Sequence, residues 1–150
     1  LRHSSAASDV YKRQEYIHRW AYKHPSPDDF FRTMEDVSGE DLGWFWRSWV
    51  LNNWKLDQAI TDVEYVEGNP ENGALITIKN MKEIPMPVTI EITTLSDKKI
   101  RKELPVEIWK KNISWTFLVD TSEAFKKVMI DPDFEYPDVD GKNNYWYGAE

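Results

Sequence analysis

The sequence predicts an α+β protein in which a three-helix segment is followed by a β-sandwich of seven strands. Up to Trp54, apolar residues recur every three or four positions, the spacing that places side chains on one face of a helix. After Trp54 the period changes to two, and turn residues recur at short intervals, which is typical of antiparallel strands. The helical and the strand-forming parts therefore follow one another along the chain.

Four segments result from this division. Residues 1–14 carry no hydrophobic period and are similar to translated adapter sequence, so we expect a non-native leader; a flexible native linker is the alternative. Residues 15–54 form the helical segment and residues 55–135 the β-sandwich. Residues 136–150 are acidic, aromatic and interrupted by proline, and we expect an irregular tail.

The composition excludes several classes of protein. The 150 residues suffice for one domain or two small ones. Nineteen basic and 26 acidic residues give a net charge of −7 without a basic cluster, which argues against a nucleic-acid partner. The absence of cysteine excludes disulfides and thiolate metal sites, and no apolar run approaches the roughly 20 residues of a membrane span.

The first predicted helix begins at Val10 or Gln14 and ends at His24, because the residue before a proline is disfavoured in a helix. Its apolar stripe consists of Ile17, Trp20, Ala21 and His24.

The second predicted helix begins at Ser26, with Pro27 in the first helical position and Asp29 completing a capping box. Its buried face is formed by Phe30, Phe31, Met34 and Val37. Gly39 can adopt the left-handed conformation that ends a helix.

The third predicted helix, residues 38–54, is the most aromatic stretch of the chain. Ser38 and Asp41 form a helix-start pattern, since both suit the positive end of the helix dipole. One face carries Leu42, Phe45, Trp46, Trp49 and Asn53, and Trp44 and Val50 widen it. About 40 residues are too few to bury so much aromatic surface. We therefore expect the helical segment to be the end of a larger helical domain.

Seven alternating segments predict the strands of the sandwich. They are residues 59–65, 74–80, 88–94, 100–104, 106–109, 113–119 and 128–130. The segment GNPENG at 68–73 is a strong turn signal, and prolines lie at strand ends rather than at strand centres. The number of strands and their even spacing are typical of a sandwich of the immunoglobulin or fibronectin type.

The sequence lacks the common catalytic motifs. It contains no H-E-x-x-H, no G-x-S-x-G, no P-loop and no glycine-rich dinucleotide motif. His18 and His24 are six residues apart and would face different ways on a helix, so a zinc ion would need ligands from elsewhere. We interpret both as surface histidines and predict no catalytic, metal-binding or substrate-binding residue in this chain.

Two acidic pairs, Asp28/Asp29 and Asp131/Asp133, could be considered as acid–base partners. The helix start explains the first pair, and a turn at a strand end explains Asp131.

Residues 138–144, DVDGKNN, look like part of a calcium-binding loop. Aligning Gly141 with the invariant glycine of that loop places Tyr136 and Tyr147 where carboxylates are needed. We therefore expect an Asx-rich turn instead.

The eight tryptophans could form a platform on which sugar rings stack. Trp115 and the tryptophans of the third helix lie in core-facing patterns, so buried packing explains most of the eight. The plausible exposed ones are Trp109, Trp54 and Trp146.

Residues 24–57, HPSPDDFFRTMEDVSGEDLGWFWRSWVLNNWKLD, contain G-x-D-L followed by aromatic residues and tryptophan. This stretch resembles the end of the catalytic domain in the aminopeptidase N-like zinc metallopeptidases, the gluzincins. The segments ITIKNMKEIPMPVTIEI, ELPVEIW and MIDPDFEYPDVD resemble the β-domain that follows it in bacterial members. The resemblance covers roughly residues 15–144.

The resemblance implies a parent enzyme that binds one zinc ion through two histidines and a glutamate and cleaves peptides from the N-terminus. A second glutamate would activate the zinc-bound water. None of these elements occurs in this chain. Met34, Glu35 and Asp36 share letters with the family's amine-binding Gly-x-Met-Glu-Asn strand but lack its glycine and lie in a predicted helix. The family's transition-state tyrosine is not assigned to Tyr16 or Tyr22.

Two hypotheses of function follow. In the first, the chain is the non-catalytic C-terminal part of a zinc aminopeptidase-like metallopeptidase, which itself holds no cofactor. Its partners are then the missing N-terminal part and, for the parent, a peptide substrate. The isolated chain would expose a contiguous aromatic patch on its helical part and would self-associate or bind hydrophobic dye. In the second, it is a free-standing β-sandwich that binds carbohydrate or protein. Bacterial relatives are often exported, but these residues assign no compartment.

Overall fold

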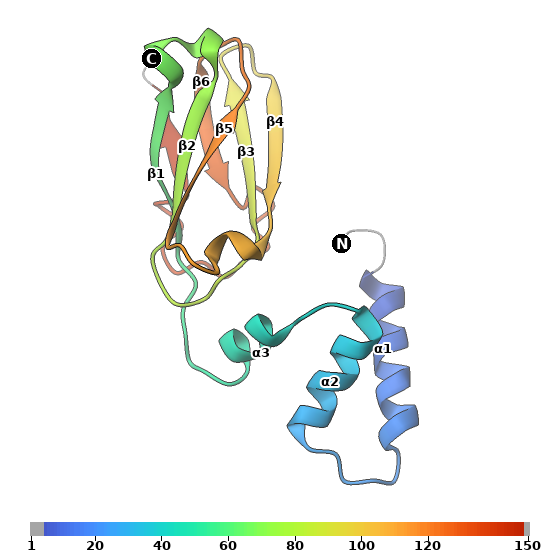
Figure 1. Ribbon diagram of the computed structural model, residues 1–150. Helices are drawn as coiled ribbons and strands as arrows, with labels where there is room; N and C mark the ends of the chain where they lie inside the picture. Colours follow the sequence, from blue (N-terminus) through green and yellow to red (C-terminus); the bar gives the residue numbers. More distant parts are fainter. Residues whose placement is uncertain (1–4, 149–150) are drawn as a thin grey trace. The chain divides into compact units, whose positions relative to one another are not determined.

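The structure is a computed structural model that describes residues 5–148 (Figure 1). Within this range it contains three α-helices and two antiparallel sheets of three and four strands, which confirms the α+β class. The chain divides between Asn52 and Asn53 into two compact units. The first unit, here the helical unit, holds the α-helices, and the second, the β unit, holds the strands.

The first helix, α1 (Ser5–Trp20), differs from the prediction at both ends. It begins at Ser5, five residues before the earlier of the two predicted starts, Val10 and Gln14; the stretch from Ser5 to Trp20 contains no glycine or proline and is compatible with a helix. It ends before His24, since Tyr22 has a left-handed backbone with φ of 62°. Its predicted C-terminal boundary was therefore wrong by about a turn.

The second helix, α2 (Pro27–Ser38), confirms the predicted caps. The Ser26 hydroxyl accepts from the backbone N–H of Asp29, and the Asp29 carboxylate accepts from the backbone N–H of Ser26. Gly39 ends the helix with φ of 68°, a conformation that L side chains adopt at a cost.

The third helix, α3 (Gly43–Trp49), has only seven residues, so the predicted helix over residues 38–54 was wrong. Ser38 belongs to the end of α2, where its hydroxyl donates to the carbonyl oxygen of Met34. Asp41 accepts from the backbone N–H of Gly43 but is not the N-cap. The left-handed Gly39 ends α2, as predicted, and the third helix begins four residues after it rather than at Ser38.

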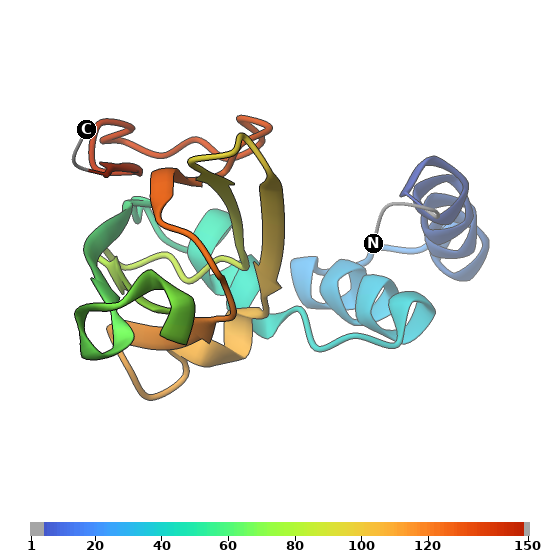
Figure 2. The same cartoon turned by 90° about the horizontal axis from the view of Figure 1, so that it is seen from above.

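The β unit contains two antiparallel sheets. The first has the order β1 (Gln58–Tyr65), β2 (Ala74–Asn80), β5 (Ser114–Val119). The second has the order β4 (Lys99–Leu104), β3 (Val88–Thr94), β6 (Phe125–Ile130), β7 (Tyr145–Tyr147). Short 3-10 turns are η1 (Val66–Gly68), η2 (Pro70–Asn72) and η3 (Val106–Trp109). In Figure 2 the strands are seen end-on.

Two elements of the β unit correct the prediction. Residues 106–109, expected as a strand, form η3, and this turn buries the consecutive residues Ile108 and Trp109 together. A strand would point neighbouring side chains to opposite faces. In the tail, expected to be irregular, Tyr145–Tyr147 forms β7 and pairs antiparallel with β6.

One hydrophobic core draws on both sheets. The alternating pattern predicted for β2 and β3 is confirmed over residues 74–79 and 88–94, since the even-numbered residues there are buried and their odd-numbered neighbours are not. The core side chains are Ala74, Ile76, Ile78, Val88, Ile90, Ile92, Ile108, Trp109, Val119, Phe125, Val128 and Ile130. Each large aliphatic side chain contributes about 1.5–3 kcal/mol by leaving water.

The outer strands β4 and β5 end their sheets in chemically different ways. β4 has the sequence KIRKEL, with charged residues of the kind that block pairing between edges. β5 has the sequence SWTFLV and carries no charge. The Asn80 N–H donates to Ile113 O, so antiparallel alternation directs the backbone groups of Ser114, Thr116 and Leu118 away from β2.

Candidate functional site

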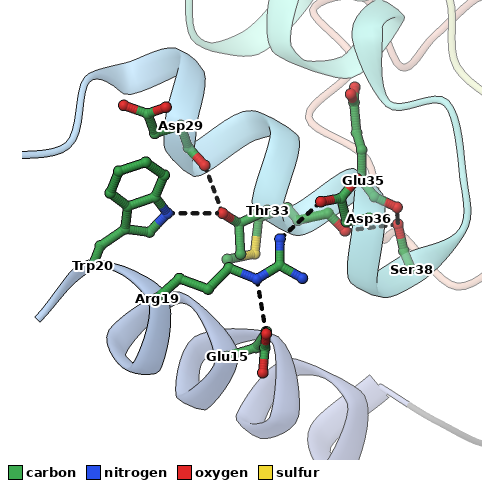
Figure 3. Close-up of polar contacts among 9 residues, drawn as sticks. Glu15, Arg19, Trp20, Asp29, Thr33, Glu35, Asp36 and Ser38 are labelled. Atoms are coloured by element: carbon green, nitrogen blue, oxygen red, sulfur yellow. Dashed lines mark hydrogen bonds and ion pairs between the residues drawn. The ribbon is translucent and has the colours of Figure 1, made fainter.

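Polar contacts hold α1 against α2 along one side of the helical unit (Figure 3). The indole N–H of Trp20 donates to the Thr33 hydroxyl at 3.1 Å, and that hydroxyl donates to the backbone oxygen of Asp29 at 2.6 Å. The Arg19 guanidinium contacts Asp36 and Glu15, both at 2.8 Å. Hydrogen bonds to Asp36 first and Glu15 second raise the pKa of Arg19, so this exposed group stays charged.

A groove with a volume of about 340 Å³ lies along the same two helices, and we call it the α1–α2 groove. It is lined by Asp9, Lys12, Arg13, Tyr16, Phe30 and Met34. The rings of Tyr16 and Phe30 meet edge to face at 5.1 Å. Lys12 and Asp9 form a loose ion pair at 4.0 Å. Arg13 has no ion pair with any residue between 5 and 148, so the groove combines apolar walls with an uncompensated positive charge.

An aromatic cluster continues from the groove into α3. Phe30 and Phe31 both contact Trp46, and the Phe31 and Trp46 rings stack at 4.7 Å with an angle of 21° between planes. The indole nitrogens of Trp46 and Trp49 are buried and lack a hydrogen-bond partner among the described residues. An unpaired buried N–H costs about 1–3 kcal/mol.

The predicted apolar stripe of α1 does not face α2 as a whole. Trp20 contacts α2, but Ile17 is 56% exposed, as is Val10 seven residues earlier on the same helix face. Both lie on the face of α1 that neighbours Arg13. The helical unit therefore presents an apolar strip beside the α1–α2 groove.

The two histidines occupy the predicted surface positions. His18 is exposed on α1, and His24 is exposed in the connection to α2. Among residues 5–148, no three His, Asp or Glu side chains are grouped so that they could hold a metal ion. Met34, Glu35 and Asp36 lie inside α2, where the backbone cannot pair with an extended peptide.

The acidic pairs are used in local structure. Asp29 is part of the α2 capping box, and hydrogen bonds from the backbone and the hydroxyl of Ser26 lower the pKa of its carboxyl. The Asp131 carboxylate accepts from the backbone N–H groups of Glu135 and Tyr136, as expected of a turn residue. Asp133 forms an ion pair with Arg101.

The segment that looks like a calcium loop is an Asx-rich turn, as predicted. Asp138 accepts from the backbone N–H groups of Gln58 and Asp140, and Asp140 accepts in turn from Lys142. The carboxylates thus bind backbone amides of the chain itself.

Among the tryptophans proposed to be exposed, Trp109 is buried, and its indole N–H donates to the Met86 carbonyl at 2.8 Å. That prediction was wrong because it rested on strand alternation in a segment that is a 3-10 turn. Trp146 packs partly buried against the core, and Trp54 is 37% exposed. The side chains that sequence reasoning missed are Phe134 and Tyr147, both well exposed, and the groove residues Lys12 and Arg13, which fell in the assumed leader.

Comparison with known proteins gives no family. The chain matches neither a protein-family model nor a curated protein. In the described part of the chain, no helix combines the length and the apolar character needed to cross a membrane.

Proposed function

We propose that this chain is the non-catalytic C-terminal part of an aminopeptidase N-like zinc metallopeptidase. In this proposal the helical unit completes the catalytic domain of the parent. The two sheets form an immunoglobulin- or fibronectin-like sandwich that supports that domain. The resemblance of residues 24–57 to the end of the family's catalytic domain supports the assignment.

The observation that carries the proposal is the apolar strip of α1. Val10 and Ile17 are each 56% exposed beside a groove with apolar walls, and the buried indole N–H groups of Trp46 and Trp49 lack partners among the described residues. Exposed apolar side chains on one helix face, next to a groove with apolar walls, are what a surface covered by another element would present. Further helices of a catalytic domain would cover the strip.

The described residues do not fit a zinc ion, because no group of three ligands is present among them. The proposal therefore places the zinc ligands and the catalytic glutamate upstream in the parent. This chain takes part in no chemical step, and its contribution is to pack against the domain that does.

The gene sequence upstream of Gln14 tests the proposal. An H-E-x-x-H motif with a further glutamate about 20 residues on is expected. The extended protein should then bind one zinc ion and release N-terminal amino acids from peptides. The matched control replaces the glutamate of that motif with glutamine, which should remove activity and keep the zinc. A stop codon upstream, or stoichiometric zinc binding by the present chain alone, would overturn the proposal.

A second candidate function is supported by the tyrosines of β7. The rings of Tyr145 and Tyr147 are nearly parallel, with 7° between planes and 6.2 Å between centroids, and Tyr147 is 66% exposed. The ammonium group of Lys127 lies 4.9 Å from the Tyr145 ring. In this alternative the ring of Tyr147, the more exposed of the two tyrosines, is the face on which a sugar ring would stack.

This alternative predicts that soluble polysaccharides retard the protein in affinity electrophoresis and that Tyr147→Ala removes the effect. Val139→Ala, at another exposed position of the β unit, serves as the control. Equal mobility of the wild type with and without polysaccharide would exclude the sugar-binding function.

A further inference from the structure

The loop of residues 131–138 presents an aromatic side chain to solvent. Phe134 is 74% exposed and has a left-handed backbone with φ of 54°. For a residue other than glycine this conformation costs about 1–2 kcal/mol. The surrounding loop must therefore supply interactions that hold Phe134 in this position.

Hydrogen bonds that the loop N–H groups donate to buried Asp131 hold the loop. The Asp131 carboxylate accepts from the N–H groups of Glu135 and Tyr136 at 3.0 and 2.9 Å, and its carbonyl oxygen accepts from the N–H of Phe134 at 3.1 Å. The ion pair between Arg101 and Asp133 ties the loop to β4. Phe134 is thus pre-organised, and a partner that binds it need not order the loop first.

The loop is strongly acidic. Residues 131–138 include four carboxylates and no basic residue; the carboxylates are Asp131, Asp133, Glu135 and Asp138. Glu135, directly after Phe134, is exposed and forms no ion pair with a residue of the described range. A partner for this loop would therefore combine an apolar pocket with a positive charge at its rim.

The α1–α2 groove has this combination. Its walls include the apolar and aromatic side chains of Tyr16, Phe30 and Met34. Lys12 and Arg13 line it with two positive charges against the single negative charge of Asp9, which already contacts Lys12. Its volume of about 340 Å³ lies at the lower end of the range for ligand pockets.

We propose that the Phe134 loop of one copy docks in the α1–α2 groove of a second copy, with Glu135 next to Arg13. The occupant is a second copy because every chain carries both parts of the contact. The loop offers a protruding aromatic ring and a negative charge, and the groove offers apolar walls and a positive charge. Different surfaces meet in this contact, so the association is heterologous and grows into chains or closes into a ring. This inference goes beyond the proposed function and does not depend on it.

Sedimentation equilibrium over a concentration series is the first test. The mass of the wild type should rise with concentration above that of the monomer, because two copies can close reciprocally and further copies can add head to tail. Added salt should weaken the association because the rim charges are exposed. Phe134→Ala should raise the dissociation constant by about 30-fold or more, as for a central aromatic anchor. The control variant Leu95→Ala removes another exposed apolar side chain of the β unit and should leave the mass distribution unchanged.

Charge reversal and mixing give the second test. Arg13→Glu and Glu135→Arg should each raise the dissociation constant by about tenfold, and the double variant should recover much of that loss. Phe134→Ala keeps an intact groove, and Arg13→Glu keeps an intact loop. Each alone should be largely monomeric, and an equimolar mixture should stop at a 1:1 dimer because one competent contact remains.

The proposal is overturned by any of three results. These are a wild type that stays monomeric at the highest concentration, a Phe134→Ala variant that associates like the wild type, and a double charge variant no better than either single one. Circular dichroism of each variant establishes that the fold is retained. None of these results bears on the upstream zinc motif, so failure here leaves the proposed function untouched.

Discussion

The carbonyl oxygen of Met86 accepts two buried hydrogen bonds. Removing both donors should lower the free energy of unfolding by more than the sum of the two single losses. The donors are the side-chain amide of Gln58 at 3.0 Å and the indole N–H of Trp109 at 2.8 Å. These three residues join β1, the connection before β3, and η3. The site thus links three elements of the β unit through one acceptor.

We expect Gln58→Met and Trp109→Phe each to lower the free energy of unfolding by about 1–2 kcal/mol. Each removes one hydrogen bond, worth about 0.5–1.5 kcal/mol, and Trp109→Phe also leaves a cavity in the core, which puts its loss at or above the upper end of the expected range. In either single variant the Met86 oxygen keeps one donor. In the double variant it loses both, which adds a desolvation penalty of about 1–3 kcal/mol.

Urea unfolding followed at amide resonances of β3 measures the effect in the β unit. The double variant should be less stable than the sum of the single losses by about 1 kcal/mol, with unchanged m values. A coupling energy within about 0.3–0.5 kcal/mol of zero would refute the reasoning, because the two donors would then act independently.

Three further predictions concern the helical unit. Thr33→Val should destabilise it by about 1–3 kcal/mol, since the indole N–H of Trp20 loses its acceptor; thermal unfolding followed by far-ultraviolet circular dichroism measures this. Gly39→Ala should cost about 1 kcal/mol in urea unfolding because of its positive φ, whereas Gly141→Ala, which has neither a positive φ nor a close neighbour, should be almost neutral. The pKa of Asp29 is lowered in the folded state. The ionised carboxylate therefore contributes fully to folding stability above the unfolded pKa of about 3.9, and this contribution is lost as the pH falls below that value. The melting temperature should therefore decline at acidic pH less steeply in Asp29→Asn than in the wild type.

Local signals predicted part of this fold. The capping box at Ser26 and the left-handed Gly39 depend on atoms within a few residues, so the sequence alone indicates both. In β2 and β3 one face of the strand is buried, so apolar residues recur at every second position, and this period can be seen in the sequence.

Errors arose where distant contacts decide the structure. Residues 106–109 fit a strand by alternation, but the buried bond from Trp109 to Met86 accompanies a 3-10 turn, and no pattern within the segment indicates that acceptor. The strand β7 forms by pairing with β6. Its own three residues carry no signal for that pairing, so the sequence did not predict it.

The candidate groove was missed for a different reason. Asp9, Lys12 and Arg13, which are all of its charged side chains, were set aside together with residues 1–14. The exposed Phe134 was also missed, since no sequence signal marks its positive φ in a loop whose Glu135 and Tyr136 N–H groups donate to the side chain of Asp131.

The uncharged outer strand β5 bears on how this protein behaves under stress. Its outward backbone groups at Ser114, Thr116 and Leu118 form a template with which another extended chain can pair, whereas the lysines of β4 oppose such pairing at an edge of the other sheet. On heating or agitation the protein should therefore form fibrils in which copies pair through this strand. A single lysine introduced by Thr116→Lys should delay their onset.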